Sequence, residues 1–277
     1  MPDHDEHDVP KILYLPIGDL VDSDTMLRME NDMKHDYYVS DDWSQNFYVL
    51  QAIRGFISVG YSSRAKADLI LPELQFSYCL LDFHNLHVGS KIRKSLHAFA
   101  NWRLRINHDF ESVLEAINTH HEKSWLNPTY RELVTQLNAN GPLSIRDPLC
   151  KNNIFFHMCS VELYDDTDSL VAGELGYVVG TTYTALTGFC DKRKGKSVGK
   201  IQILALAKLL QSCGFSFFNL GQPPTDGHMQ YKVELGGQVV ERRAFLDRWK
   251  SQLHLIPSNL AHFLDADISI QSLEIAK

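Results

Sequence analysis

The clearest hydrophobic periodicities of the chain lie in the segment 173–222. Aromatic and β-branched residues dominate an extended run that includes Tyr177 and Tyr183 on one face, and this alternation predicts a strand buried on at least one side. Residues 201–210 are apolar around most of a helix, so this helix should be largely buried. A glycine that would end the helix precedes a short apolar run of strand length, residues 215–220. Together these patterns predict a β-loop-α-β unit.

Shorter patterned segments precede this unit. Helices are predicted at residues 47–53, 109–120 and 129–137, and strands at 69–71, 76–83, 154–164 and 171–189. Asp109 stands where the cap of the second helix would lie, and Pro128 stands in the first turn of the third. The sequence YDDTDS forms a polar hairpin tip between the last two strands. Residues 1–40 are polar apart from an apolar island at 12–17, which favours a loosely packed arm.

These elements predict an α/β (α+β) protein whose mixed sheet is flanked by helices. A chain of 277 residues is long enough for one large domain or two smaller ones. We expect an N-terminal arm at residues 1–41, a small N-terminal domain at 42–95 and a larger domain at 96–277.

Composition narrows the setting in which the protein works. The chain is 44% hydrophobic and 22% charged, which is ordinary for a globular protein in water. Its five cysteines form no CxxC pair and no zinc-type spacing with histidine, which favours reduced thiols, no metal site and a cytoplasmic location. No stretch reaches the roughly 18 apolar residues of a membrane span, and the acidic start is unlike a targeting signal. The net charge of -7 argues against a coat of nucleic acid but permits a local basic patch.

Two segments concentrate positive charge. The first holds Lys91, Arg93 and Lys94, and the second holds Lys192, Arg193, Lys194, Lys196 and Lys200. The second segment also contains two glycines and precedes the predicted helix, an arrangement that attracts phosphate through backbone N–H groups and the helix dipole. Its spacing does not fit the GxxxxGK[ST] phosphate loop. A tRNA backbone or the pyrophosphate of an acyl-CoA would suit this loop, and both segments are also compatible with solvated surface.

Several short motifs follow one another in a collinear order over residues 42–250. They are DWS at 42–44, AIRGF at 52–56, LHVGSKIRKSLH at 86–97, DFESVLEAI at 109–117, SWL at 124–126 and HMQYKVELGGQVVERRAFL at 228–246. In this order the sequence resembles the leucyl/phenylalanyl-tRNA-protein transferases. The resemblance implies a GNAT-like larger domain and an enzyme that moves an aminoacyl group from charged tRNA to a protein N-terminus. Positioning and hydrogen bonds supply much of such catalysis, so no metal, ATP or other cofactor is expected.

The resemblance also implies active-site residues. Asn219 and Gln222 would lie at the reacting end, where Gln222 would orient the α-amino group or the ester carbonyl; a register shifted by one residue would place Gly221 there. The pocket for a leucine or phenylalanine side chain would be formed by Trp125, Tyr183, Ile203, Leu206 and Phe218. The terminal adenosine would stack on Trp125. Each pocket residue would also suit a hydrophobic core, and the sequence around Asn219 would also suit a simple turn.

Two acidic residues of the family pattern are replaced in this chain. Asn219 stands where an aspartate is usual, and Leu186 stands where many bacterial members carry a glutamate. Those acids would recognise a cationic acceptor N-terminus or orient its amine, and asparagine supplies no charge for that purpose. Glu174, Asp191 and Asp226 are the nearby acids that would compensate. We therefore expect either a changed acceptor preference or slow transfer.

Three functions stay open on the sequence. The first is an aminoacyl-tRNA-protein transferase that gives a Leu- or Phe-type residue to an acceptor N-terminus and so marks the acceptor for N-terminus-dependent degradation (an N-degron). The second is a GNAT-like N-acyltransferase that uses acyl-CoA. The third is a non-catalytic tRNA- or peptide-binding member of the fold. In the first case the partners are aminoacyl-tRNA and an acceptor protein or peptide, without a membrane, and we expect a monomer.

Overall fold

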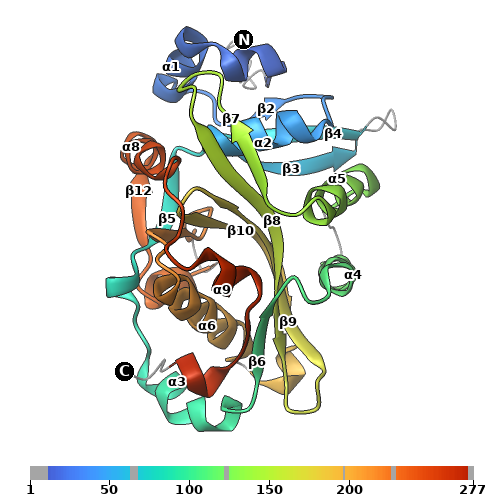
Figure 1. Cartoon of the computed structure of the whole chain (residues 1–277), viewed down its shortest axis with the longest axis vertical. Helices are drawn as coiled ribbons and strands as arrows, with labels where there is room; N and C mark the ends of the chain where they lie inside the picture. Colours follow the sequence, from blue (N-terminus) through green and yellow to red (C-terminus); the bar gives the residue numbers. More distant parts are fainter. Residues whose placement is uncertain (1–11, 63–67, 122–124, 196, 226–228, 274–277) are drawn as a thin grey trace, which may run out of the picture.

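The computed structural model describes residues 12–62, 68–121, 125–195, 197–225 and 229–273 (Figure 1). Within these residues a nine-stranded sheet has the order β12-β5-β11-β10-β9-β8-β6-β13, and β7 pairs with β8 beside this path. Its strands are β5 (Ser77–Leu81), β6 (Arg103–Ile106), β7 (Leu143–Arg146), β8 (Asn153–Tyr164), β9 (Leu170–Val179), β10 (Thr182–Cys190), β11 (Phe217–Asn219), β12 (Gln238–Glu241) and β13 (Asp267–Ser269). β10 and β11 pair in parallel, whereas the other neighbours are antiparallel, so the sheet is mixed as predicted.

The described chain also forms two small sheets and a set of helices. The small sheets pair β1 (Leu13–Tyr14) with β2 (Tyr38–Val39), and β3 (Ile57–Ser62) with β4 (Asp68–Glu73). β2, β3 and β4 lie together at one end of the large sheet (Figure 1). The helices are α1 (Ser23–Asn31), α2 (Gln45–Ile53), α3 (Ser90–Ser95), α4 (Phe110–His120), α5 (Pro128–Ala139), α6 (Val198–Ser212), α7 (Tyr231–Glu234), α8 (Arg242–Gln252) and α9 (Leu260–Leu264). Short 3-10 turns at Ile17–Val21, Phe83–Asn85, Leu96–Phe99, Lys192–Lys194 and Ile270–Leu273 complete the described chain. The α/β class with a mixed sheet flanked by helices is therefore confirmed.

Two hydrophobic cores lie on the two faces of the large sheet. α6 and α9 pack in one core, and α2, α4, α5 and α8 pack in the other (Figure 1). Successive side chains of a strand point to opposite faces, and β11 shows this directly, because Phe217 lies in the second core and Phe218 in the first. The predicted burial of the helix at 201–210 is confirmed: Ile201, Leu204 and Leu210 have no exposed surface.

The predicted continuous strand from 171 to 189 is wrong. The chain turns at Gly180, whose φ of 56° is left-handed, and continues as β10 antiparallel to β9. Val178 therefore pairs with Tyr183, and Tyr177 lies in the core on the other face from Tyr183. The hairpin was missed because the residues on both sides of Gly180 have high strand propensity, so the turn has almost no compositional signal.

The expectation of a loosely packed N-terminal arm is also wrong for the part that the structure describes. Leu20 and Met26 are buried in the core, and Asp22 caps α1 by accepting from the Thr25 amide at 2.8 Å. The buried guanidinium of Arg242 donates to the backbone carbonyls of Met29, Asp32, His35, Leu74 and Gln75. These bonds tie the arm to the segment between β4 and β5. Residues 1–11 lie outside the described residues.

Local sequence signals correctly place the four predicted helices, α2, α4, α5 and α6, whereas α1, α3, α7, α8 and α9 were not predicted. Asp109 caps α4 by accepting from the Ser112 amide, and Asn127 caps α5 by accepting from the Tyr130 amide. Gly214, with a φ of 80°, follows α6 as predicted. β5 belongs to the segment expected as the small domain, and it pairs with β11 and β12 of the large sheet. The division into domains at residues 42 and 96 stays a prediction.

Candidate active site

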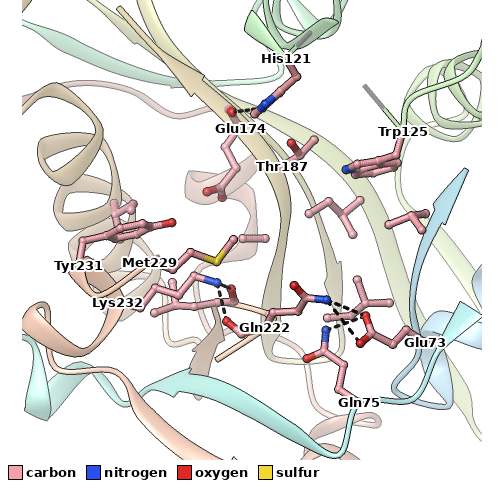
Figure 2. Close-up of a pocket in the computed structure, with 18 residues that line it drawn as sticks. Glu73, Gln75, His121, Trp125, Glu174, Thr187, Gln222, Met229, Tyr231 and Lys232 are labelled. Atoms are coloured by element: carbon pink, nitrogen blue, oxygen red, sulfur yellow. Dashed lines mark hydrogen bonds between the residues drawn. The ribbon is translucent and has the colours of Figure 1, made fainter. Parts of the chain in front are cut away.

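A cavity opens where β10 and β11 stop pairing. Their last paired residues are Thr184 and Asn219, although β10 continues to Cys190 and carries a bulge between Ala185 and Thr187. Beyond this point β10 and the segment that follows β11 border a cavity of about 440 Å³ (Figure 2). Its wall is formed by Ile57, Val59, Glu73, Gln75, His121, Trp125, Glu174, Ala185, Leu186, Thr187, Gly188, Ile203, Leu220, Gly221, Gln222, Met229, Tyr231 and Lys232. The parallel pair β10–β11 thus brings residues from distant parts of the sequence to one hollow.

One edge of the cavity is a cluster of two amides, Gln75 and Gln222, around the carboxylate of Glu73 (Figure 2). Gln222 Nε2 donates to the two carboxylate oxygens of Glu73 at 3.2 Å and 3.4 Å, and to the hydroxyl of Tyr37 at 3.3 Å. Gln75 Nε2 donates to the same carboxylate at 3.2 Å. Burial raises the pKa of Glu73, and the hydrogen bonds from Gln75 and Gln222 oppose that rise. Sequence reasoning missed Glu73 because nothing local marks the last residue of β4 as part of this site.

The backbone beside Gln222 is held by a buried lysine. Lys232 Nζ donates to the carbonyl of Leu220 at 2.6 Å and to that of Gln222 at 2.7 Å. Burial lowers the pKa of Lys232, whereas the nearby thiol of Cys79 and carboxyl of Glu174 raise it. Sequence reasoning did not select Lys232, although it lies within the quoted motif at 228–246. It fixes the direction in which the segment after β11 leaves the sheet.

Glu174 contributes a second carboxyl group to the cavity. Its Oε1 accepts the hydroxyl hydrogen of Tyr183 at 3.0 Å. Burial raises the pKa of Glu174 to about 7, and the Tyr183 hydrogen bond and the charge of Lys232 oppose this rise. Because this pKa lies near neutrality, Glu174 can exchange a proton under physiological conditions.

A neighbouring cavity of about 420 Å³ adjoins the first and shares Glu174, Gly188, Ile203 and Tyr231 with it. The remaining lining includes His120, Lys192, Gly199 and Lys200, so this second cavity lies beside the start of α6. Burial and the charges of His121 and Lys192 lower the pKa of His120. The two cavities together offer one mainly apolar chamber and one with cationic side chains.

The structure brings part of the expected site together. Gln222, Trp125, Ile203 and Glu174 line the first cavity, and so does Leu186, where the family pattern has an acid. Tyr183, Leu206 and Phe218 have no exposed surface and belong to the hydrophobic core on the face of α6. The family resemblance implied that these three side chains share in an aminoacyl pocket, but they line neither of the two cavities.

The other expected acids and the asparagine lie elsewhere. Asn219 is buried; its Oδ1 accepts from the Gly221 amide at 3.0 Å, and its Nδ2 lies 3.4 Å from Thr184 Oγ1. The Asp191 carboxylate accepts from Arg193 and does not line the first cavity. Asp226 lies outside the described residues. Asn219 therefore shapes the turn that presents Gln222, without facing the cavity itself.

Most cations of the basic loop have acidic partners. Arg193 pairs with Asp191 at 2.9 Å, Lys194 with Asp165 at 2.7 Å and Lys200 with Glu234 at 2.5 Å. Lys192 forms no ion pair among the residues that the structure describes, and Lys196 lies outside them. Lys91, Arg93 and Lys94 lie on α3 and border neither of the two cavities. The loop thus offers less free positive charge than its sequence suggests.

The described residues hold neither a metal-type cluster nor a membrane-spanning helix. They contain no group of three or more His, Cys, Asp or Glu side chains placed to hold a metal ion. No helix in the described ranges has the length and apolar character needed to cross a membrane.

The mixed sheet flanked by helices, with a cavity that joins an apolar wall to an amide-carboxylate edge, defines a mixed α/β protein. Residues 80–250 match the family model for leucyl/phenylalanyl-tRNA protein transferase. Since this match covers more than half of the chain, the chain belongs to that family, as its motifs predicted.

The chain is similar to a bacterial transferase and to two solved structures at low sequence identity. A leucyl/phenylalanyl-tRNA–protein transferase of Cereibacter sphaeroides is 24% identical over 133 residues, which cover 48% of this chain and 52% of that protein. The chain thus spans about half the length of this relative. The structure of L-PGS from Bacillus licheniformis is similar with 13% identity and a TM-score of 0.35, over 64% of this chain and 65% of that one. The C-terminal domain of a putative lysylphosphatidylglycerol synthetase from Agrobacterium fabrum has 12% identity and a TM-score of 0.35, over 83% and 65% of the respective chains.

Proposed function

We propose that this protein transfers a hydrophobic aminoacyl group, of the leucine or phenylalanine type, from aminoacyl-tRNA to the N-terminal α-amino group of an acceptor protein. The transfer would mark the acceptor for N-terminus-dependent degradation. Membership of the family supports this proposal, and so does a cavity that joins an apolar wall to a polar edge. The single observation that carries it is that Trp125, Leu186 and Ile203 line the same cavity as Gln222.

The proposed reaction forms one bond and breaks another. The neutral amine nitrogen of the acceptor attacks the ester carbonyl carbon, a C–N bond forms, and the bond from that carbon to the ribose oxygen breaks. A proton leaves the amine and ends on the ribose oxygen. Gln222 would orient the amine through its side-chain carbonyl, and Glu174, with a pKa of about 7, is suited to carry the proton. Correct positioning supplies much of the barrier reduction.

The aminoacyl side chain would lie against the apolar wall of the first cavity. Ile57, Val59 and Ile203 line this wall, and none of them brings a polar group. The adjoining cavity with Lys192 and Lys200 would receive the phosphate-bearing end of the tRNA. We also propose that the protein is cytoplasmic and acts as a monomer.

Acceptor choice is proposed to differ from that of members with both acids. Positions 186 and 219 carry neutral side chains, whereas the carboxyl groups that border the cavity belong to Glu73 and Glu174. A cationic acceptor side chain would then meet its counter-charge at Glu73 or Glu174 and not at position 186 or 219. The Glu73 carboxylate, moreover, already accepts three hydrogen bonds. We expect either a changed preference or slow transfer.

A panel of acceptor peptides tests this proposal. Leucyl-tRNA labelled in the amino acid is incubated with the protein and with peptides that begin with Arg, Lys, Asp or Glu. Transfer to at least one peptide supports the function, and efficient transfer to the Arg peptide alone would contradict the altered acceptor choice. Parallel incubations with phenylalanyl-tRNA and with acetyl-CoA show whether the donor is instead another aminoacyl-tRNA or an acyl-CoA.

A further inference from the structure

We infer that Glu73 is a positioning residue that holds the side-chain amide of Gln222 with its carbonyl oxygen facing the cavity. This inference rests on the proposed function, because it assigns the orientation of a group that would receive the acceptor amine. It differs from the expectation on the sequence, in which the acid of the site would stand near residue 219.

The contacts of Glu73 decide which end of the amide faces it. An ionised carboxylate accepts hydrogen bonds and donates none, so only the NH₂ end of Gln222 can approach it favourably. Gln222 Nε2 lies within 3.4 Å of both Glu73 oxygens and 3.3 Å from the Tyr37 hydroxyl. Figure 2 shows the oxygen of the Gln222 amide turned away from Glu73. A flipped amide would place that oxygen against two carboxylate oxygens.

The Glu73 side chain is held more firmly than that of Gln222. Glu73 is 8% exposed, its strand β4 pairs with β3 at Ile57, and Gln75 donates to its carboxylate. Gln222, in contrast, has an exposed side chain, although Lys232 holds its backbone carbonyl. The buried and hydrogen-bonded Glu73 is therefore the partner that sets the orientation of the exposed Gln222 amide.

The consequence for the reaction is a defined hydrogen-bond acceptor at the cavity edge. With its NH₂ end bound to Glu73, the Gln222 carbonyl oxygen is left to accept a hydrogen from the acceptor α-amine. That bond would aim the nitrogen lone pair at the ester carbon. A freely rotating amide would present its NH₂ end in part of the molecules, and this end repels an N–H donor.

Exchanging the two side chains tests the inference. Glu73→Gln lets the Gln222 amide flip, and Gln222→Glu places two carboxylates together, so each single change should lower kcat at least tenfold. The KM for leucyl-tRNA should change little. In the double variant Glu73→Gln/Gln222→Glu, the new amide donates to the new carboxylate, which still offers a free oxygen to the cavity. Its kcat should recover to within a few-fold of the unchanged protein.

A direct probe of the contact keeps the inference separate from the proposed function. The side-chain amide resonances of Gln222, followed by NMR against pH, should shift as Glu73 takes up a proton and should lose this shift in Glu73→Gln. Tyr37, Tyr78 and Asp36 are titratable groups that interact with Glu73, and Asp36 is the carboxyl among them, so Asp36→Asn serves as the control that keeps the shift. A flat titration in the unchanged protein overturns the inference, whether or not transfer occurs. A double variant as slow as the single ones, with an unchanged melting temperature, overturns it as well. Absence of transfer together with a normal titration would contradict the proposed function alone.

Discussion

The hydroxyl of Tyr183 donates to the carboxyl group of Glu174 across 3.0 Å, from β10 to its neighbour β9. The contact is possible because Gly176 lies between them without a side chain; a Cβ there would come 2.2 Å from the Tyr183 oxygen. A core tyrosine thus supports a carboxyl group at the edge of the cavity. Tyr183 therefore acts on the site from within the core.

Glu174 should make the stability of the protein depend on pH. Its pKa is about 7 in the folded state against an ordinary value of 4.5. Below pH 4.5 the Glu174 carboxyl is protonated in both the folded and the unfolded state, so it does not lower the free energy of unfolding. As pH rises towards 7 the unfolded state ionises first, so stability falls, and above 7 the full cost remains. This cost is about 3 kcal/mol as an upper bound, because part of the side chain faces the open cavity.

Glu174→Gln should remove this cost. We expect the variant to be more stable than the unchanged protein at pH 8 and about equally stable at pH 4, below the ordinary carboxyl value, as measured by urea unfolding at both values. The exposed Glu132→Gln is the matched control and should leave the difference between the two pH values unchanged. Equal pH dependence in Glu174→Gln and the unchanged protein would contradict the raised pKa.

Gly180 should tolerate no side chain. Its φ is 56°, and a Cβ would lie 2.2 Å from the backbone oxygen of Gln252. Gly141 has a similar φ of 69° with open space around it. Alanine at Gly141 therefore brings backbone strain alone, whereas alanine at Gly180 brings the same strain and a steric clash. Gly141→Ala should lower the free energy of unfolding by about 1–2 kcal/mol, and Gly180→Ala by about 3 kcal/mol or more. Equal losses in thermal or urea unfolding would show that the hairpin does not pack against Gln252.

Lys192 and Lys194 should differ in their effect on tRNA binding. Lys194 is paired with Asp165, whereas Lys192 lines the second cavity and has no ion pair in the described part of the chain. In Lys192→Ala, the slope of the logarithm of the tRNA binding constant against the logarithm of the salt concentration should be smaller in magnitude by about 0.7–0.9. This is the value for one lost phosphate contact. Lys194→Ala should change that slope less. Binding titrations with tRNA at several salt concentrations measure both slopes. Equal changes in the two variants would mean that the ion pair between Lys194 and Asp165 breaks when tRNA binds.

Trp125 should contribute to donor binding through its ring. It lines the first cavity, and its ring packs edge-on against Tyr130 with centroids 4.9 Å apart. If adenosine stacks there, Trp125→Ala should weaken donor affinity by about 1–3 kcal/mol, or roughly 5- to 150-fold. Trp125→Phe keeps an aromatic face and should lose much less. Equal losses in the two variants, measured with leucyl-tRNA, would point to a packing role instead.

The sequence predicts the elements better than their relations in space. Capping residues such as Asp109 act on the next turn of their own helix, so a local pattern is enough to place α4. The turn at Gly180 puts Tyr183 on the opposite face of the sheet from Tyr177, whereas the alternation predicted both on one face. Glu73 lies 149 residues from Gln222, and only the assembled sheets bring them together. Family order pointed to Gln222, but no motif pointed to its partner.

The most direct test of the account is transfer of labelled leucine from tRNA to a peptide N-terminus. The unchanged protein and Gln222→Ala are compared with the same leucyl-tRNA and acceptor panel, and the products are identified by mass. The account predicts a peptide longer by one leucine, formed at least tenfold more slowly by Gln222→Ala. No leucine on any peptide, although the folded protein binds leucyl-tRNA, would contradict it.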